Sequence, residues 1–583
     1  MLDYRNLNTL WASVMVETLH RLGLTTAVVC PGSRSTPLTL ALARHPSIEA
    51  IPILDERSAA FFALGVAKRS HQPVVLVCTS GTAGANFFPA IIEAKESHVP
   101  LIVLTADRPP EMHACASGQT IDQQKLYGAF VNSYGEMAVP ESPLLHYARQ
   151  TMVHTWTKAL LPTAGPVHIN CPFRDPLAPL SDSTALQLDE NRFFSAVVPP
   201  ILGNITPDLL PKSLVSRWVN SERGLIVAGP AQPQSPEKYC RAVAQLSQTL
   251  GYPVLAESLS PLRNYQSLNP YLISTYDSLL RHTAEQLIPE YVIQLGPLPT
   301  SKALRQWLSQ HQPLTYQVMP HALNLDPLHG RTQSLSLSVE CLGKLIASEK
   351  PIGETSAYCQ DWIDCDRAIS QKLTHTFQSL ETPFEGKISW ILSQSLPEGT
   401  PLMIANSMPI RDMESFWQPN DQHIQPYFSR GANGIDGTLS TAMGIAHNSQ
   451  HSLLLTGDLA FLHDTNGLLN TRHLKGSLTV ILINNQGGGI FEMLPIANFE
   501  PPFEEYCATP QTVNISELCQ AYGVQHTLIQ TWEQLTQKVQ ELALTNQSSL
   551  RVLEFRTDRK ADAQWRKTHI KSWGQDPRPM SPP

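Results

Sequence analysis

TGDLAFLHDTNGLLNTRHLKGSLTVILINN, residues 456–485, carries the most informative fold signal in this 583-residue chain. A strand predicted over 452–455 runs into a Gly-Asp pair, and a strand predicted over 479–483 runs into an Asn-Asn pair. Asp458 and Asn485 lie 27 positions apart (485 − 458), which leaves room for one crossover helix between two parallel strands. Both polar ends then meet at the carboxyl edge of one sheet, where open α/β folds bind ligands.

The residues at this edge suit a metal-bound diphosphate. The carboxylate of Asp458, the amide oxygen of Asn485 and the carbonyl oxygen of Gly487 are hard ligands for Mg²⁺, with Mn²⁺ as a possible substitute. The run Gly487–Gly489 allows the backbone to approach a diphosphate closely. The pattern resembles the thiamine diphosphate (ThDP) binding motif. The alternative is an ordinary βαβ unit with polar loops, since each residue pair is common by itself.

Composition indicates a globular protein of several domains. The length predicts roughly three to four domains, and the net charge of −8 argues against a chain built to bind nucleic acid. The sequence contains no apolar run of the roughly 18 residues that a membrane span needs, and its N-terminus does not resemble a signal peptide. Ten cysteines without a CxxC pair favour a reducing, cytoplasmic location.

Strand and helix signals alternate in three segments, which predicts an α/β protein with three doubly wound parallel-sheet domains. The predicted units are residues 1–185, 205–345 and 381–560, followed by a basic tail over 561–583 that we expect to be solvated. The expected strands are 25–30, 50–54, 73–79, 100–106 and 165–172 in the first unit, 224–231, 253–258 and 291–299 in the second, and 401–406, 453–458, 479–485 and 551–556 in the third.

Glu56 is the candidate for activating the cofactor, because ThDP enzymes use a glutamate that binds the aminopyrimidine ring. It stands where an apolar strand is expected to end and a helix to begin, so partial burial would raise its pKa and favour proton sharing. One alternative is that Glu56 is only a first-turn residue favoured by the helix dipole. Another is that the neighbouring Asp55 takes the role.

Four arginines stand at predicted strand ends beside Gly, Pro or Ser turns. They are Arg34, Arg108, Arg411 and Arg430. An isolated surface arginine is usually only a solvated charge, but a guanidinium fork binds a carboxylate bidentately. Four such forks on the expected ligand-binding edge indicate substrates that carry several carboxylates.

Seven segments together resemble the 2-succinyl-5-enolpyruvyl-6-hydroxy-3-cyclohexene-1-carboxylate (SEPHCHC) synthase family of menaquinone and phylloquinone biosynthesis. They are PGSRSTPLTLAL (31–42), DERSAAFFALGVAK (55–68), TSGTAGANFFPAIIEA (79–94), LTADRPPE (104–111), GPVHINCPFRDPL (165–177), SRGANGIDGTLSTAMG (429–444) and NNQGGGIF (484–491). The resemblance spans nearly the whole chain and is weakest from about 190 to 380. It implies three domains of the ThDP-dependent decarboxylase type.

The resemblance also implies an activity: decarboxylation of 2-oxoglutarate and 1,4-addition of the resulting carbanion to isochorismate. Asp458, Asn485 and Gly487 would bind the metal, Ile435 would support the cofactor, and Glu56 would activate it. The residues lining the substrate pocket would be Ser33, Arg34, Arg108, Gln119, Lys302, Ser407, Arg411 and Arg430, with Arg34, Gln119 and Arg411 in catalytic roles, and an apolar wall of Ile490, Phe491 and Leu494. Each of the last three is more often a core residue.

Two positions depart from the patterns, and other functions remain open. Leu459 follows Asp458 where the general ThDP motif has glycine, and Ala303 follows Lys302 where some family members have a second basic residue. The runner-up function is another ThDP-dependent 2-oxo acid decarboxylase or acetolactate-synthase-like carboligase, and the third is a non-catalytic protein of this fold. The family layout places the first unit of one subunit against the third of another, so we expect a homodimer or a dimer of dimers.

Overall fold

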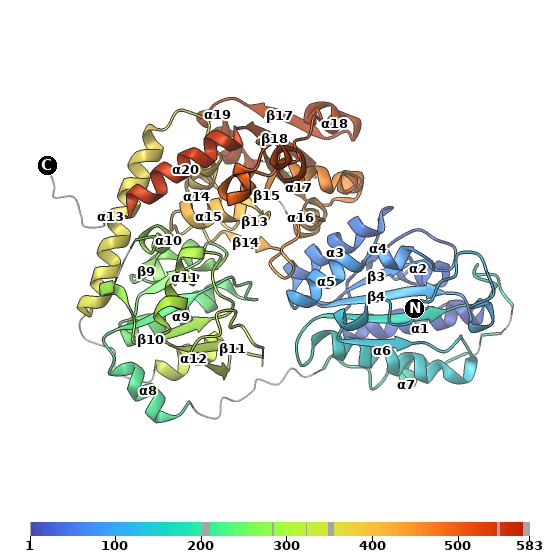
Figure 1. The fold of residues 1–583 in the computed structure, drawn as a ribbon. Coiled ribbons are helices and arrows are strands. Elements are labelled where there is room, and N and C mark those ends of the chain that lie inside the picture. Colours follow the sequence, from blue (N-terminus) through green and yellow to red (C-terminus); the bar gives the residue numbers. More distant parts are fainter. Residues whose placement is uncertain are drawn as a thin grey trace.

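The computed structural model describes residues 2–182, 184–185, 187–200, 210–282, 285–321, 323–347, 355–449, 451–544 and 549–574. They form three α/β units, and each unit has a six-stranded sheet whose paired strands all run parallel (Figure 1). The predicted fold class is therefore confirmed. No helix in the described part of the chain is long and apolar enough to cross a membrane.

The first unit has strand order β2-β1-β3-β4-β6-β5. Its strands are β1 (Thr26–Val29), β2 (Glu49–Pro52), β3 (Val74–Cys78), β4 (Leu101–Asp107), β5 (Ser133–Glu136) and β6 (Pro166–Pro172), and its main helices are α1 (Leu7–Leu22), α2 (Thr36–Ala43), α3 (Glu56–Ser70), α5 (Phe88–Glu96) and α6 (Leu145–Leu160). Strands β3, β4 and β6 are buried along their whole length, as the continuous apolar runs predict for a doubly covered parallel sheet. The polar edge strand β5 lacks that signal and was not predicted.

The middle unit has strand order β12-β11-β10-β7-β8-β9. Its strands are β7 (Gly224–Ala228), β8 (Val254–Ala256), β9 (Leu272–Ile273), β10 (Tyr291–Leu295), β11 (Leu314–Met319) and β12 (Thr332–Ser336), and its main helices are α9 (Pro236–Leu250), α10 (Tyr276–Leu279), α11 (Lys302–His311) and α12 (Val339–Ile346). The long helix α13 (Ala357–Ser379) connects this unit to the third.

The third unit repeats the strand order of the first, β14-β13-β15-β16-β18-β17. Its strands are β13 (Pro401–Ile404), β14 (Gln425–Phe428), β15 (Ser452–Gly457), β16 (Ser477–Asn484), β17 (Gln525–Ile529) and β18 (Ser549–Arg556), and its main helices are α14 (Glu385–Ser395), α15 (Met408–Phe416), α16 (Thr438–Ala446), α18 (Ile515–Ala521), α19 (Trp532–Gln540) and α20 (Arg559–Trp573). The crossover from β15 to β16 is made of the short helix α17 (Asp458–His463) and the 3-10 segment Thr465–His473, where the sequence predicted one helix.

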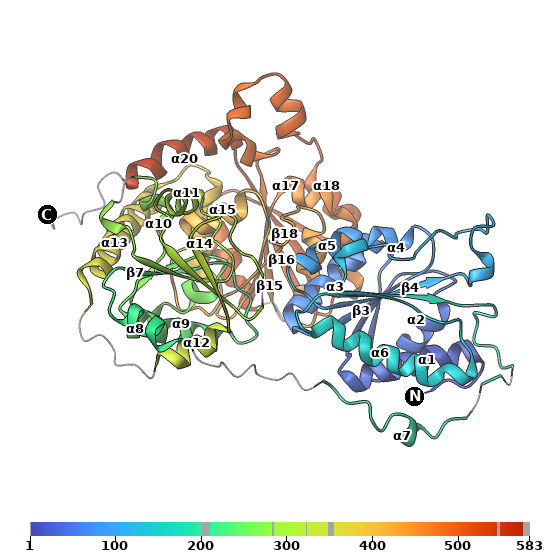
Figure 2. The same ribbon diagram turned by 60° about the horizontal axis from the view of Figure 1, so that its bottom comes forward.

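Helix α20 corrects the expectation of a solvated tail. Residues Arg559–Trp573 are helical, and Ala563, Ile570 and Trp573 are buried. Ile570 and Trp573 belong to the apolar core that includes the third unit, and Arg559 and Arg566 of the same helix are buried too. Figure 2 shows the helix lying against the rest of the molecule. Residues 575–583 lie outside the described residues.

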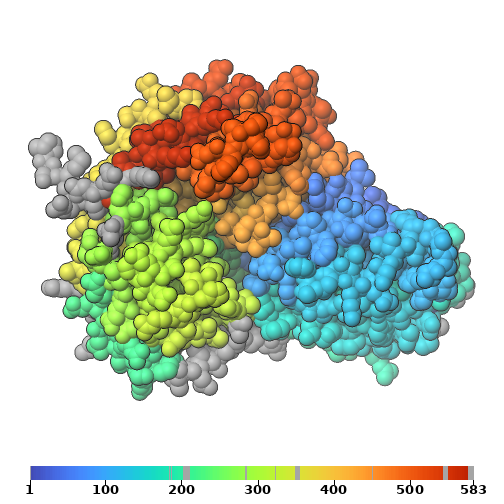
Figure 3. Space-filling model, viewed as in Figure 1, coloured from blue at the N-terminus to red at the C-terminus, as the bar shows by residue number. Residues whose placement is uncertain are grey.

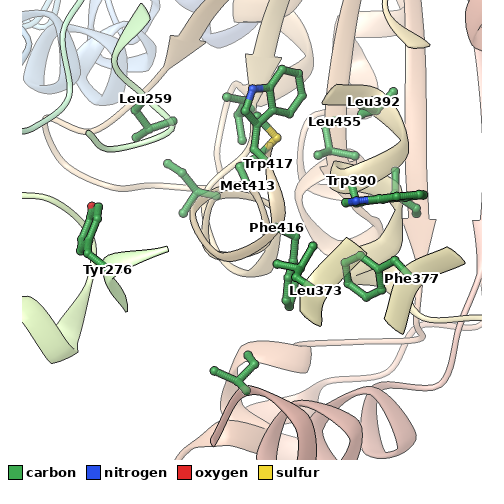
Figure 4. Close-up of a cluster of buried hydrophobic side chains, with 14 of the residues drawn as sticks. Leu259, Tyr276, Leu373, Phe377, Trp390, Leu392, Met413, Phe416, Trp417 and Leu455 are labelled. Atoms are coloured by element: carbon green, nitrogen blue, oxygen red, sulfur yellow. The ribbon is translucent and has the colours of Figure 1, made fainter. Parts of the chain in front are cut away.

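The third unit shares a hydrophobic core with each of the other two. One core joins α10 of the middle unit to α13, α14 and α15, and Figure 4 shows Tyr276, Phe377, Trp390, Phe416 and Trp417 in it. A second core joins α3 and α5 of the first unit to α16 and the sheet of the third. Figure 3 shows the units adjoining on one face of the molecule.

Two glycines set the contact between the first and third units. A Cβ on Gly65 of α3 would lie 2.1 Å from the carbonyl oxygen of Thr441, and one on Gly444 of α16 would lie 2.0 Å from the carbonyl oxygen of Phe62. Helices α3 and α16 therefore pack backbone to backbone, and Figure 1 shows them side by side where the two units meet.

Candidate active site

The Gly-Asp and Asn-Asn pairs meet at the carboxyl ends of the neighbouring strands β15 and β16. The N–H of Gly487 donates to Oδ2 of Asp458 at 2.9 Å, and the N–H of Leu459 donates to Oδ1 of the same side chain at 2.7 Å. The structure therefore confirms that the ends of these two strands meet. Burial raises the pKa of Asp458 to about 6, although these backbone N–H groups favour the carboxylate.

The amide of Asn485 is oriented by a buried charge network. Its Nδ2 donates to Oε2 of Glu385 at 2.9 Å, and Oε1 of Glu385 accepts from Nη2 of Arg566 at 2.8 Å. Arg566 also bonds both carboxylate oxygens of Asp412, at 2.6 and 2.8 Å. Because Nδ2 is engaged, Oδ1 is the atom of Asn485 left to face a ligand.

Arg559, at the start of α20, stabilises the loop after Asn485. Its Nη1 donates to the carbonyl oxygen of Gln486 at 3.1 Å, and its Nε donates to Oε1 of Glu492 at 2.9 Å. Sequence reasoning missed Glu385, Arg559 and Arg566. Arg559 and Arg566 stand in a basic segment with no motif, so only their contacts mark them as part of the site.

The loop at Gly487 fits a diphosphate and a metal ion. Gly487 has φ +135°, and a Cβ there would lie 2.4 Å from the carbonyl oxygen of Ala508, so the position requires glycine. Among the described residues, no group of three or more His, Cys, Asp or Glu side chains is placed to bind a metal ion. A site made of one carboxylate, one amide oxygen and one backbone carbonyl needs no such group, and these hard donors suit Mg²⁺.

A pocket opens between this loop and the strand end of β13. Its described lining residues all lie between 385 and 491, and they include nine of the predicted site residues: Ser407, Arg411, Arg430, Ile435, Asp458, Asn485, Gly487, Ile490 and Phe491. Leu459, the departure from the general motif, also lines it, as does Asn406. Leu494 is partly buried and is not among the described lining residues.

Two arginines line this pocket: Arg411 belongs to helix α15, and Arg430 lies in the loop after β14. Arg411 donates from Nη1 to the carbonyl oxygen of Ser407 at 2.6 Å, and Arg430 donates from Nη1 to Oδ1 of Asn406 at 3.1 Å. Burial lowers the pKa of Arg411, and the charge of Arg430 lowers it further. Two partly desolvated guanidinium groups that repel each other are suited to binding an anion between them.

The middle unit contributes charges that sequence reasoning did not name. Burial lowers the pKa of Arg430, the carboxylate of Glu257 raises it, and the guanidinium of Arg305 lowers it. Lys302 itself is exposed and is not among the described lining residues, while Ala303 is 7% exposed and packs into the core. A basic side chain at position 303 would therefore meet the core of the middle unit here.

Three of the predicted site residues of the first unit form a separate cluster. Nη1 of Arg108 donates to Oγ of Ser80 and, at 3.0 Å, to the carbonyl oxygen of Gln119, whose Nε2 donates to the carbonyl oxygen of Ser80 at 3.1 Å. Arg34 is close enough to lower the pKa of Arg108, and its Nη1 donates to the carbonyl oxygen of Phe173 at 2.8 Å.

Ser33 is exposed in the turn beside Arg34. The described lining of the pocket in the third unit includes neither Ser33, Arg34, Arg108 nor Gln119. Within one chain, the predicted substrate residues of the first unit therefore do not line the pocket that contains those of the third unit.

Glu56 is the first residue of α3, beside the third unit of the same chain. Asp55 caps the helix by accepting from the N–H of Ser58 at 2.9 Å, and its Oδ2 accepts from Nδ2 of Asn466 at 2.6 Å. Glu56 is partly buried, and burial raises its pKa as expected, with a further rise from the charge of Asp55. The cap role of Asp55 makes it the more structural of the two carboxylates.

Comparison with known proteins agrees with this geometry. Residues 11–126 match the N-terminal TPP binding domain of thiamine pyrophosphate enzymes, 205–404 their middle domain, and 412–555 their C-terminal TPP binding domain. Proteins named SEPHCHC synthase are 56% identical in Gloeothece citriformis, 55% in Nostoc sp. and 53% in Acaryochloris marina, each over 98% of this chain and 99% of the relative. The chain belongs to the SEPHCHC synthase family.

Membership of the SEPHCHC synthase family agrees with the sequence motifs and with the three sheets. It makes the chain an enzyme with thiamine pyrophosphate binding domains at both ends. In this member of the SEPHCHC synthase family, Leu459 lines the pocket and its N–H donates to Oδ1 of Asp458, a backbone bond that a residue other than glycine can make.

Proposed function

We propose that this chain catalyses the ThDP- and Mg²⁺-dependent decarboxylation of 2-oxoglutarate and the 1,4-addition of the remaining four-carbon unit to isochorismate. The products are SEPHCHC and CO₂, in menaquinone or phylloquinone biosynthesis. One observation carries the proposal: a single pocket combines Asp458, Asn485 and Gly487 with Arg411 and Arg430. A diphosphate anchor beside paired guanidinium groups suits a cofactor enzyme whose substrates are dicarboxylates.

In the proposed site, Asp458, Asn485 and the carbonyl of Gly487 would bind the metal, and Ile435 would support the cofactor. Glu56 is not among the described lining residues of this pocket, so the Glu56 of a second copy of the chain would exchange a proton with the cofactor. ThDP supplies the nucleophilic carbon and the electron sink that decarboxylation of a 2-oxo acid requires. Glu56 suits proton exchange because burial raises its pKa above the ordinary value of a glutamate.

The proposed substrate groups of the third unit are Ser407, Arg411 and Arg430, beside an apolar wall of Ile490 and Phe491. The arginines bind carboxylates and so align the reacting carbons, which is a gain from positioning. We retain Ser33, Arg34, Arg108, Gln119, Lys302 and Leu494 as substrate residues only in an assembly that brings further chain segments to the pocket.

We infer that the assembly is a cytoplasmic homodimer or a dimer of dimers. The pocket takes its described lining from the third unit, while the cluster of Arg34, Arg108 and Gln119 lies on the first, so a second copy could complete the site. Exposed apolar side chains support a covered surface: Phe491 of the pocket lining is 36% exposed, and Val513, which lines a second pocket that shares Ile435 and Leu459 with the first, is 46% exposed. Ten free cysteines suit a reducing compartment.

The test is an assay with Mg²⁺, ThDP, 2-oxoglutarate and isochorismate that follows the loss of isochorismate. We expect isochorismate consumption that requires all four components. Turnover of pyruvate without consumption of isochorismate would instead identify a general ThDP-dependent decarboxylase or carboligase. Absence of both, with ThDP still bound, would identify a non-catalytic member of the fold.

A further inference from the structure

We propose that Lys68 and Glu93 of the first unit are positioning residues for Arg430 of the third. The inference rests on the proposed function, because it assigns Arg430 to substrate binding. Nζ of Lys68 lies 3.9 Å from Oε1 of Glu93, and both residues are only 3% exposed. They come from α3 and α5 of the first unit, yet their polar atoms contact the loop of the third unit that carries Arg430.

The pair bonds the backbone on both sides of Arg430. Oε1 of Glu93 accepts from the N–H of Gly431 at 3.1 Å, and Oε2 accepts from the N–H of Ala432 at 2.7 Å. Nζ of Lys68 donates to the carbonyl oxygen of Phe428 at 2.9 Å. Charge-assisted bonds to three backbone groups over five residues restrict how that loop can move.

Asn406 binds the same loop from within the third unit. Its Nδ2 donates to the carbonyl oxygens of Ser429 and Gly434, both at 2.7 Å, and its Oδ1 accepts from Nη1 of Arg430. The loop therefore lies between Asn406 on one side and Lys68 with Glu93 on the other. Its arginine is left directed into the pocket that Asn406 also lines.

Stability alone does not account for the pair. Burial lowers the pKa of Lys68, and the charge of Glu93 opposes that shift. A buried ion pair often contributes no more to folding than apolar residues of similar size, because both ions lose their hydration. What the pair adds is a defined position for the backbone of residues 428–432.

Gly431 shows how closely the loop approaches α5. A Cβ at this position would lie 2.8 Å from Cβ of Glu96, 2.8 Å from Oγ of Ser97 and 3.0 Å from the carbonyl oxygen of Glu93. Gly431→Ala would therefore displace the loop from α5 without changing either charged side chain. Glu93→Gln leaves the buried charge of Lys68 without its partner and can therefore prevent folding. In that case Gly431→Ala tests the same displacement of the loop.

The experiment compares Glu93→Gln, Gly431→Ala and Arg430→Ala, with Glu96→Gln as the control. Glu96 lies on the same helix but is exposed. We expect Arg430→Ala to raise the KM of one substrate, and Glu93→Gln and Gly431→Ala to raise the KM of that same substrate roughly tenfold, about 1.4 kcal/mol, with kcat nearly unchanged. Glu96→Gln should leave both constants at their native values.

A double-mutant cycle tests whether Glu93 acts through Arg430. We expect Glu93→Gln to add no further rise in KM once Arg430 is alanine. A rise of the same size in both backgrounds would overturn the proposal, as would an effect on kcat alone.

Amide hydrogen exchange provides a readout that needs no substrate. In Glu93→Gln the amides of Gly431 and Ala432 should exchange faster, while peptides of the first unit keep their native rates. Native exchange at these two amides would overturn the positioning role. If the wild-type protein consumes no isochorismate, the proposed function fails, and the exchange experiment still decides whether Glu93 orders the loop.

Discussion

The N–H of Gly487 donates to Oδ2 of Asp458 at 2.9 Å, and so joins the ends of neighbouring strands at positions 29 residues apart in the chain. With the N–H of Leu459 on Oδ1, both carboxylate oxygens are oriented by backbone groups. The Asp458 carboxylate is therefore held in one orientation before any ligand binds, which is what the proposed metal site requires.

Asp458→Asn should abolish tight Mg²⁺-dependent binding of ThDP. The amide can still accept from Gly487, but it lacks the negative charge that a divalent cation requires, so we expect affinity to fall by about 100-fold or more. Isothermal titration of ThDP at saturating Mg²⁺ measures the change. The control is Asp464→Asn, a buried carboxylate that accepts from the N–H of Ser440 at 2.7 Å and is not among the described lining residues of the pocket. Equal losses in the two variants would contradict a specific metal role.

Gly487→Ala should destabilise the protein more than a matched glycine substitution. The new Cβ meets the carbonyl oxygen of Ala508, and φ is +135°, so we expect a cost of about 2 kcal/mol or more. Gly523→Ala is the control, because Gly523 has φ +67° with open space around its Cβ, and should cost only about 1 kcal/mol. Scanning calorimetry gives both values. Similar losses would show that φ alone matters at Gly487.

Glu56→Gln should slow exchange of the C2 proton of bound ThDP by orders of magnitude. The raised pKa of Glu56 allows its carboxyl group to share a proton with the cofactor. The amide of glutamine can neither take up nor release that proton. Quenched deuterium exchange followed by NMR measures the rate. Asp55→Asn is the control: asparagine caps a helix about as well as aspartate and can still accept from the N–H of Ser58, so exchange should stay near the native rate. Slower exchange in Asp55→Asn alone would transfer the role to Asp55.

Glu257→Gln should make stability less sensitive to a rise in pH from about 5 to 8. Burial, with the charge of Glu414, raises the pKa of Glu257 from 4.5 to about 8. A carboxyl whose folded pKa is raised contributes stability that is fully present below pH 4.5 and lost as the pH rises through 8. Glutamine does not ionise and can still accept from the N–H of Thr300, which bonds Oε1 of Glu257 at 3.0 Å.

The difference between Glu257→Gln and the wild type should therefore grow between pH 5 and 8, by up to about 1.4 kcal/mol for each pH unit. Melting temperatures of the two proteins measured over this range give the comparison. Parallel curves would show that Glu257 keeps an ordinary pKa in the folded state.

Much of the fold could be predicted because its signals are local. The core strands β3, β4 and β16 are continuous apolar runs, and parallel pairing follows from the helices between them. Six strands were missed: β5, β9, β11, β12, β14 and β17. Of these, the edge strands β5, β12 and β17 are polar and only partly buried, so they lack that signal. The tail was misjudged for a similar reason: the basic residues of α20 obscure an apolar face that only docking buries.

By itself the sequence determined that Asp458 and Asn485 would meet, because two parallel strands of known spacing place their ends on one edge. It also determined the acidic and basic residues available there. Only the tertiary structure decided that Arg566 supports Asn485 through Glu385, and that Glu93 binds the backbone beside Arg430 from another unit. Those contacts join residues far apart in the chain, and they depend on how whole units pack, which no local pattern encodes.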